Sequence, residues 1–315
     1  MADEKIAYAS VRKSTASLHR MTERRLREMY LRLISITCLT TGLLACGDNV
    51  EPHEHPDAGT ADAGPQPVSI AFAAEVGGIP FACGQTFTGV GTTASSYVGT
   101  DFRFYVHDVR LVGASGDVTV ALDANEFQAD GVALLDFETG GTGCQMGSTS
   151  THTALTGTVP AGTYTGIKFK VGVPFAMNHL DVATAAAPLN IPAMFWAWSS
   201  GYKFLKADGA VGNAGFNVHL GSTGCGVMGT TPPTAPCTNP NIMDISLTGY
   251  SLGTSIVVAD VARVLEGVDV STNTAATAPG CMSFPNDPEC NTVLPKLGLA
   301  YGANPAGAQT LFAVE

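Results

Sequence analysis

The stretch "DFRFYVHDVRLV" (residues 101–112) places bulky side chains at every second position of the chain. Phe102, Phe104 and Val106 fall on one side of an extended backbone, and the residues between them fall on the other. A period of two indicates a β-strand, because the side chains along one face of a helix recur every three or four residues. The stretch therefore predicts a strand with an apolar face.

Other segments of the chain repeat this pattern between turns rich in Gly, Pro and Ser, and the chain contains 36 glycines. Regularly spaced short strands without helices between them are typical of sandwiches and barrels. We therefore expect an all-β fold over residues 68–315, an antiparallel β-sandwich or barrel-like domain stapled by disulfides. The further predicted strands cover residues 68–76, 132–138, 162–175, 194–198, 202–208, 216–221, 242–247 and 254–265, with a short helix at 261–267.

The first 45 residues have the pattern of an export signal. Four arginines between positions 24 and 32 precede an apolar stretch from Leu33 to Ala45, which is too short to span a membrane permanently. The stretch ends in Leu-Leu-Ala-Cys at 43–46, which resembles the lipobox of bacterial lipoproteins, so we expect cleavage before Cys46 and acylation of its thiol. Because the signal begins late, we expect translation to start at Met21 or Met29.

Residues 46–67 are rich in Asp, Ala, Gly and Pro, which predicts a disordered tether between the lipid and the folded domain. Without residues 1–45 the chain has 8 basic and 23 acidic residues, a net charge of −15. Such acidity argues against nucleic acid as a partner and suits a basic protein or cations. The expected location is the cell envelope, with the lipid in the membrane, on the periplasmic or surface side of the outer membrane.

Six cysteines remain in the expected folded domain, and an even number in an exported chain indicates disulfides. Proximity along the sequence favours Cys83 with Cys144, Cys225 with Cys237 and Cys281 with Cys290, although six cysteines permit fifteen pairings. A zinc site is disfavoured, because no Cys-x-x-Cys pair is present.

Signatures of common enzymes are missing from the sequence: there is no Gly-x-Ser-x-Gly, no His-Glu-x-x-His and no nucleotide-binding fingerprint. The expected domain contains His107, His152, His179 and His219. Neutral imidazoles from separate strands suit copper. Hydrogen-bonded polar residues at strand ends are the alternative, and the residues alone favour it.

Both tryptophans of the chain, Trp196 and Trp198, fall within "MFWAWSSGYKF" (residues 194–204). On a strand they would share one face with Met194. Core packing, or a ridge on which a ligand stacks, is one interpretation. The other is chemical, since indole is among the side chains most easily oxidised.

Several collinear stretches resemble the MbnP-like family, also described as metallo-mystery-pair four-cysteine proteins associated with methanobactin operons. They are "DFRFYVHDVRLV", "VALLDFETGGTGC", "VPAGTYTGIKFKVGVPFAMNH", "PLNIPAMFWAWSSGYKFLKAD", "FNVHLGSTGC" and "APGCMSFPNDPEC", which lie in order between residues 68 and about 300. The resemblance extends over the whole expected domain.

The resemblance implies a copper-binding protein that is not itself an enzyme. Its partner would be a di-haem cytochrome c peroxidase of the MauG-like type, which oxidises a tryptophan to kynurenine. The oxidised residue would be Trp198 or Trp196, with Trp198 slightly preferred, and the copper ligands would be His179, His219 and, less strongly, His107. A β-sandwich surface module that uses a tryptophan ridge to contact sugar or protein is the alternative function.

Overall fold

The strand predicted from residues 101–112 is the middle part of β4 (Ser95–Gly113), which pairs with five other strands. The computed structural model describes residues 64–315 except 145, 148, 198 and 228–230. The expected signal, the expected lipid site Cys46 and Trp198 therefore lie outside the described residues. Among the helices that are described, none is long and apolar enough to cross a membrane.

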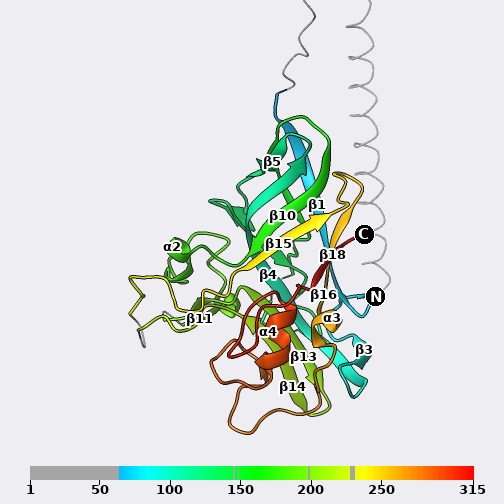
Figure 1. The fold of residues 1–315 in the computed structure, drawn as a ribbon, viewed down its shortest axis with the longest axis vertical. Coiled ribbons are helices and arrows are strands. Elements are labelled where there is room, and N and C mark those ends of the chain that lie inside the picture. The colour runs from blue at the N-terminus through cyan, green and yellow to red at the C-terminus, as the bar shows by residue number, and fades with distance from the viewer. Residues whose placement is uncertain (1–63, 145, 148, 198, 228–230) are drawn as a thin grey trace, which may run out of the picture. The chain divides into compact units, whose positions relative to one another are not determined.

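The strands form two large sheets and a small hairpin (Figure 1). The first sheet runs β18–β16–β1–β9–β6 with β2 added to β1, and the second runs β15–β10–β4–β13–β14–β17 with β3, β5, β7 and β8 added. The bounds of the first sheet are β1 (Gln66–Val76), β2 (Ile79–Pro80), β6 (Ala121–Leu122), β9 (Ala154–Val159), β16 (Ile256–Asp260) and β18 (Phe312–Val314).

The bounds of the other strands of the second sheet are β3 (Thr86–Val90), β5 (Gly116–Thr119), β7 (Gln128–Ala129), β8 (Val132–Asp136), β10 (Tyr164–Val171), β13 (Leu205–Val211), β14 (Ala214–Leu220), β15 (Met243–Thr248) and β17 (Gly280–Cys281). The hairpin consists of β11 (Phe195–Ala197) and β12 (Gly201–Tyr202). The helices are α2 (Phe175–Asn178), α3 (Val261–Leu265) and α4 (Cys290–Lys296), with a 3₁₀ turn, η1 (Pro192–Met194).

Aromatic side chains join the two sheets in a common core. Phe72 of β1 lies edge-on to Phe104 of β4 and Phe169 of β10, with ring centroids 6.1 and 5.6 Å apart. Phe312 of β18 packs edge-on against Phe104 and Phe169 at 5.3 and 5.2 Å. Edge-to-face contacts of this kind add to the stabilisation from buried area. The expected all-β fold is thus confirmed, with parallel pairing only where β1 meets β16 and β14 meets β17 among the described strands.

The structure contains the disulfides Cys83–Cys144, Cys225–Cys237 and Cys281–Cys290, which are the pairs that sequence proximity favours. The predicted helix is α3, two residues shorter than expected, and the Asp260 carboxylate caps it by accepting a bond from the Ala262 N–H. The first strand begins at Gln66, two residues before the expected domain boundary.

The predicted strand at 194–198 is wrong at its beginning. Met194 ends the 3₁₀ turn η1 and is fully buried, and the strand begins at Phe195. Pro192 begins this turn, because its fixed backbone angle suits the first turn of a helix. Met194 therefore does not continue a row of side chains with Trp196.

Candidate functional site: a buried histidine beside Trp196

The β13–β14 hairpin places a histidine against a carboxylate. Asp208 pairs with Asn217 and Lys206 pairs with His219, so Asp208 and His219 are diagonal neighbours on one face of the hairpin. The Nε2 atom of His219 lies 2.6 Å from Oδ1 of Asp208, and His219 is only 6% exposed. Because a carboxylate accepts hydrogen bonds, Nε2 carries the proton and donates it.

The other ring nitrogen of His219, Nδ1, is positioned to bind a metal ion through its lone pair. Nδ1 is buried and has no hydrogen-bond partner among the described residues. In the neutral imidazole with its proton on Nε2, Nδ1 has the lone pair that binds a metal ion. Metal-binding histidines usually donate their second nitrogen to a carboxylate, as His219 does to Asp208. The residues present therefore fit a metal ion at Nδ1.

A chain of buried charges holds Asp208 in place. Its Oδ2 lies 3.4 Å from Nζ of Lys206, which also contacts Asp101, and Asp101 forms a two-point ion pair with Arg103. Burial acts to raise the pKa of Asp208, but His219 and Lys206 outweigh burial and lower it below its usual value. Asp208 is thus held ionised as the acceptor for His219.

Trp196 lies directly beside this histidine. Its ring centroid is 5.9 Å from that of His219, and it stacks on Phe284 with centroids 5.5 Å apart and ring planes 28° apart. At position 221 only glycine fits, because a Cβ there would lie 2.7 Å from Cζ3 of Trp196. One face of the indole is covered by Phe284, so Trp196 does not offer that face to an external ligand. The position of Trp198 is outside the described residues.

His179 lies at the end of α2 and is 8% exposed. Its Nε2 is 3.3 Å from Nδ2 of Asn178 and 3.8 Å from Sγ of Cys237. Oδ1 of Asn178 accepts a bond from the Tyr202 N–H, which identifies Nδ2 as the donor toward His179. The lone pair of His179 Nε2 therefore faces Asn178 and the sulfur of Cys237.

Asn178 also ties the segment of His179 to the segment of His219. Its Nδ2 lies 2.8 Å from Oγ of Ser222, which follows His219 by three residues. Asn178 is 1% exposed, and a Cβ on Gly201 would lie 2.3 Å from its carbonyl oxygen. The end of α2, the β11–β12 hairpin and the chain after β14 are thereby fixed against one another.

Two groups of ligand-type atoms each contain a disulfide. His179 lies with Cys225 and Cys237, and Glu138 lies with Cys83 and Cys144. Within each group the two cysteines form a disulfide with each other. Their sulfurs are therefore not thiolates and do not bind a metal as thiolates do.

His107 lies away from Trp196 and His219. It pairs with Lys170 of β10, and Nδ1 is 2.9 Å from the carbonyl oxygen of Gly172. His219 of β14 pairs with Lys206 of β13, and Lys206 pairs with Arg103 of β4. Arg103 precedes His107 by four residues along β4. Four residues of a strand span about 13 Å. Burial lowers the pKa of His107, as expected of a neutral histidine packed in a sheet.

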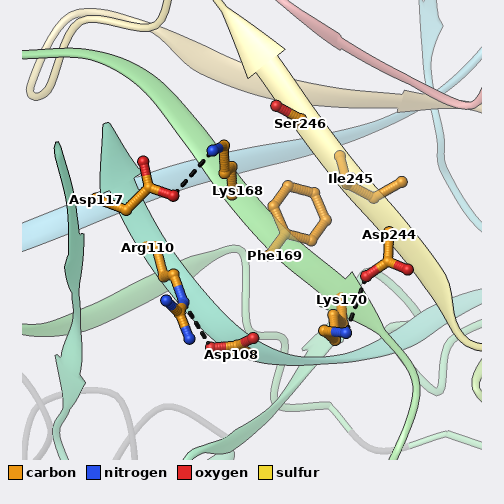
Figure 2. A pocket seen from close by; sticks show the side chains of 9 residues that line it. All are labelled: Asp108, Arg110, Asp117, Lys168, Phe169, Lys170, Asp244, Ile245 and Ser246. Carbon is orange, nitrogen blue, oxygen red and sulfur yellow. Dashed lines mark hydrogen bonds and ion pairs between the residues drawn. The ribbon is translucent and has the colours of Figure 1, made fainter. Parts of the chain in front are cut away.

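A cavity of about 340 Å³ opens next to the site, with Ser200, Cys225 and Phe284 in its wall. A second cavity of about 290 Å³ lies over β10, between β4 and β15 (Figure 2). Its walls carry the ion pairs Arg110–Asp108, Lys168–Asp117 and Lys170–Asp244. None of the residues predicted from the sequence lines the second cavity, and its cations are matched by aspartates.

Asp208, Asn178 and Phe284 were not predicted as site residues. Asp208 could have been found from the sequence, because "YKFLKAD" and "FNVHLG" alternate as the two strands of one hairpin. Asn178 and Phe284 carry no such signal, because their contacts join segments distant in sequence.

The fold and the site define a class of protein: an all-β domain with three disulfides and a buried histidine beside a tryptophan. A family model described as MbnP matches residues 65–283. The chain belongs to the MbnP family. Among solved structures it is similar to MbnP from Methylosinus trichosporium, with 30% identity, a TM-score of 0.71, and coverage of 79% of this chain and 98% of that one. No curated protein sequence matches the chain.

Proposed function

We propose that this chain is a non-catalytic copper-binding protein of the cell envelope, and that a di-haem MauG-like peroxidase oxidises Trp196 or Trp198 to kynurenine. The observation that supports the proposal best is the pairing of Trp196 with His219, whose Nε2 donates to Asp208 and whose Nδ1 is buried without a partner among the described residues. Membership of the MbnP family supports it further.

Copper(I) is the expected ion, because imidazole nitrogens are ligands that suit copper and the site is partly buried. His219 would bind through Nδ1. His179 is the second candidate, since Asn178 ties its segment to that of His219. For His179 to bind through Nε2, the hydrogen bond from Asn178 would have to be given up. His107 is the weakest of the three candidates, because it lies elsewhere on β4.

Oxidation of the tryptophan would add a ligand to this set. Two molecules of hydrogen peroxide, each reduced to water at the partner's haems, would cleave the C2–C3 bond of the indole and give N-formylkynurenine. Hydrolysis then releases formate and leaves kynurenine. Indole has only an N–H donor, whereas kynurenine has an aromatic amine and a ketone oxygen that are able to bind a metal.

Copper binding is tested by comparing the wild-type chain with the variants His219→Ala, His179→Ala and His107→Ala. His152→Ala is the matched control, because His152 is a partly buried histidine that forms an isolated β-bridge with Asp136, stacks on Phe127 and bonds to the Leu134 carbonyl oxygen. We expect copper(I) affinity to fall most in His219→Ala and to be unchanged in His152→Ala. Equal affinity in wild type and His219→Ala would refute the site.

The modification is tested by peptide mass spectrometry after co-expression with the neighbouring di-haem protein. Kynurenine at position 196 or 198 is expected, and unmodified tryptophan at both positions beside an active partner would reject that part of the proposal. Lipid anchoring has its own test. Replacing Cys46 by Ser should move the protein from the membrane fraction to the soluble fraction.

A further inference from the structure

Exposed apolar side chains gather around Trp196 and His179. Six large apolar side chains are exposed among the described residues, and three of them are Phe175, Leu180 and Phe284. Phe175 lies edge-on to the ring of His179 with centroids 5.4 Å apart, and Leu180 is the residue after His179. Phe284 stacks on Trp196. Such a concentration of exposed apolar side chains marks a surface that binds a partner.

The three side chains belong to one continuous surface. Nδ2 of Asn178, at the end of α2, lies 3.5 Å from the carbonyl oxygen of Ser200, so α2 is held against the β11–β12 turn. Ser200 and Phe284 both line the cavity of about 340 Å³ next to the site. We refer to the surface formed by Phe175, Leu180, Phe284 and this cavity as the apolar face.

The segments that build the apolar face carry no net charge. Residues 171–243 and 270–286 together contain two acidic and two basic residues, whereas the rest of residues 64–315 contains 16 acidic and six basic residues. The four are Asp181, Lys203, Lys206 and Asp208. Lys206 and Asp208 belong to the chain of buried charges behind His219. The acidity of the whole chain therefore does not describe this surface.

We propose that the apolar face is the docking surface for the haem protein that oxidises the tryptophan, and that an uncharged, apolar patch of that protein covers it. This inference rests on the proposed function, in which the oxidant has to approach Trp196. Phe284 covers one face of the indole and is itself 44% exposed. A protein that contacts Phe284 is thus separated from Trp196 by a single side chain.

The chemistry of the face selects this kind of partner. The cores of protein interfaces are rich in aromatic side chains and depleted of charged ones, as the apolar face is. A basic patch fits it poorly, because the cations would lose their water without gaining an opposite charge. Salt screens attraction between exposed charges but does not weaken the burial of apolar surface. Docking at the apolar face is therefore insensitive to salt.

The first test is the affinity of the purified chain for the neighbouring di-haem protein, measured by calorimetry at about 50 and about 500 mM NaCl. We expect the Kd to rise by less than about threefold over this range, since little charge is paired in the interface. A Kd that rises by more than this shows that oppositely charged surfaces hold the partner, and it overturns the proposal.

The second test places a charge on the apolar face with Phe175→Asp and Leu180→Asp. Each variant should raise the Kd about tenfold or more, because the new carboxylate is buried without a partner. The KM of the chain in kynurenine formation should rise with it while kcat changes little, since a saturating concentration restores docking. Ile79→Asp is the matched control. It adds the same charge at an exposed apolar residue of β2, in the other sheet, and should keep the wild-type Kd and KM.

The outcomes separate the docking surface from the proposed function. Wild-type Kd and KM in both Phe175→Asp and Leu180→Asp overturn the docking surface, and kynurenine formed in the same assay leaves the proposed function standing. If the wild-type chain binds the di-haem protein but is not oxidised, the oxidation is refuted and the Kd values alone decide the docking surface. If the wild-type chain does not bind, both are overturned. The salt series on the wild type decides even if a variant fails to fold.

Discussion

The hydrogen bond between Asp208 and His219 determines which nitrogen of the histidine is free to bind a metal. Oδ1 of Asp208 lies 2.6 Å from Nε2, and Nδ1 has no partner among the described residues. A carboxylate accepts only, so it selects one tautomer of the imidazole. An amide in its place selects neither, because its oxygen accepts and its nitrogen donates.

We therefore predict that Asp208→Asn lowers copper(I) affinity about 10- to 100-fold, the range typical for partners of metal-binding histidines. Affinity is measured by competition with a coloured copper(I) chelator. In the metal-free protein, ¹⁵N NMR of the His219 ring should show a population protonated on Nδ1. Asp244→Asn serves as control, because that aspartate is exposed and forms its ion pair with Lys170 of β10 rather than a bond to a histidine. An Asp208→Asn variant with wild-type affinity and tautomer would contradict the prediction.

A second buried carboxylate makes stability depend on pH. Asp136 is 3% exposed, and burial raises its pKa to about 7, with Arg103 acting in the opposite direction. Between its usual pKa and about 7, the folded state holds a proton that the unfolded state has released. Asp136 therefore makes the protein less stable as the pH rises through this window.

Asp136→Asn should remove this loss, since the amide oxygen still accepts the bond of 2.9 Å from the Glu138 N–H. Between pH 5 and pH 8, the variant should lose less free energy of unfolding than the wild type, by up to about 3 kcal/mol. Urea unfolding at a series of pH values measures the difference. Glu126→Gln, a change at an exposed carboxylate, should leave the wild-type curve unaltered. If the plots of unfolding free energy against pH are parallel for wild type and Asp136→Asn, burial does not raise the pKa of the Asp136 carboxyl.

At the scale of elements, the position of β13 depends on a glycine next to Asp208. A Cβ on Gly209 would lie 2.0 Å from Cζ of Tyr97, so the tyrosine ring lies directly over the strand. In the paired strand β14, a Cβ on Gly215 would have its nearest neighbour at 3.7 Å, an ordinary contact. The two glycines thus lie in the same sheet but differ in the room available for an added side chain.

Gly209→Ala should lower the free energy of unfolding by about 1–3 kcal/mol through overpacking. It should also weaken copper binding, because the shift of β13 moves Asp208. Gly215→Ala should change neither quantity appreciably. Urea unfolding and the chelator competition assay measure the two effects. Equal midpoints for the two variants would mean that Tyr97 moves aside freely.

The strands that could be predicted are those whose side chains alternate strongly. The stretch 101–112 forms part of β4, and 216–221 corresponds to β14. The stretch 202–208 overlaps β13 only from Leu205, because Tyr202 belongs to β12. The strand β9, "ALTGTV", was not predicted, because its small residues give little alternation although it pairs along β1. Helix α4 was also missed, since it is short and contains Pro295.

From the sequence, the types of residue in the site could be predicted, but not how these residues are arranged in space. Histidine and tryptophan suggested copper and oxidation, and only the family resemblance ranked His107 below His219, without a physical reason. That distinction comes from register, which places His219 beside Asp208 and leaves His107 paired with Lys170. Phe284 reaches Trp196 from 88 positions further along the chain, next to the parallel pairing of β17 with β14. Sequence patterns do not encode contacts of this range.

At the scale of the whole molecule, the disulfides differ in the length of chain that they close. Cys83 and Cys144 are separated by 61 positions, and Cys225 and Cys237 by 12. A longer loop loses more entropy in the unfolded state when it is closed. The shorter loop contributes less in this way, but Cys237 lies 3.8 Å from Nε2 of His179.

We therefore predict that replacing each pair by alanines ranks the two variants in opposite order for loss of stability and for loss of copper affinity. Removing Cys83–Cys144 should lower the free energy of unfolding by about 4 kcal/mol, and removing Cys225–Cys237 by about 3 kcal/mol. Copper(I) affinity should fall about tenfold or more only in the second case, because that disulfide packs against His179. Denaturant unfolding and chelator competition on both double variants measure these effects. If removing Cys83–Cys144 has the larger effect on affinity, then general stability, rather than the contact at His179, controls the copper site.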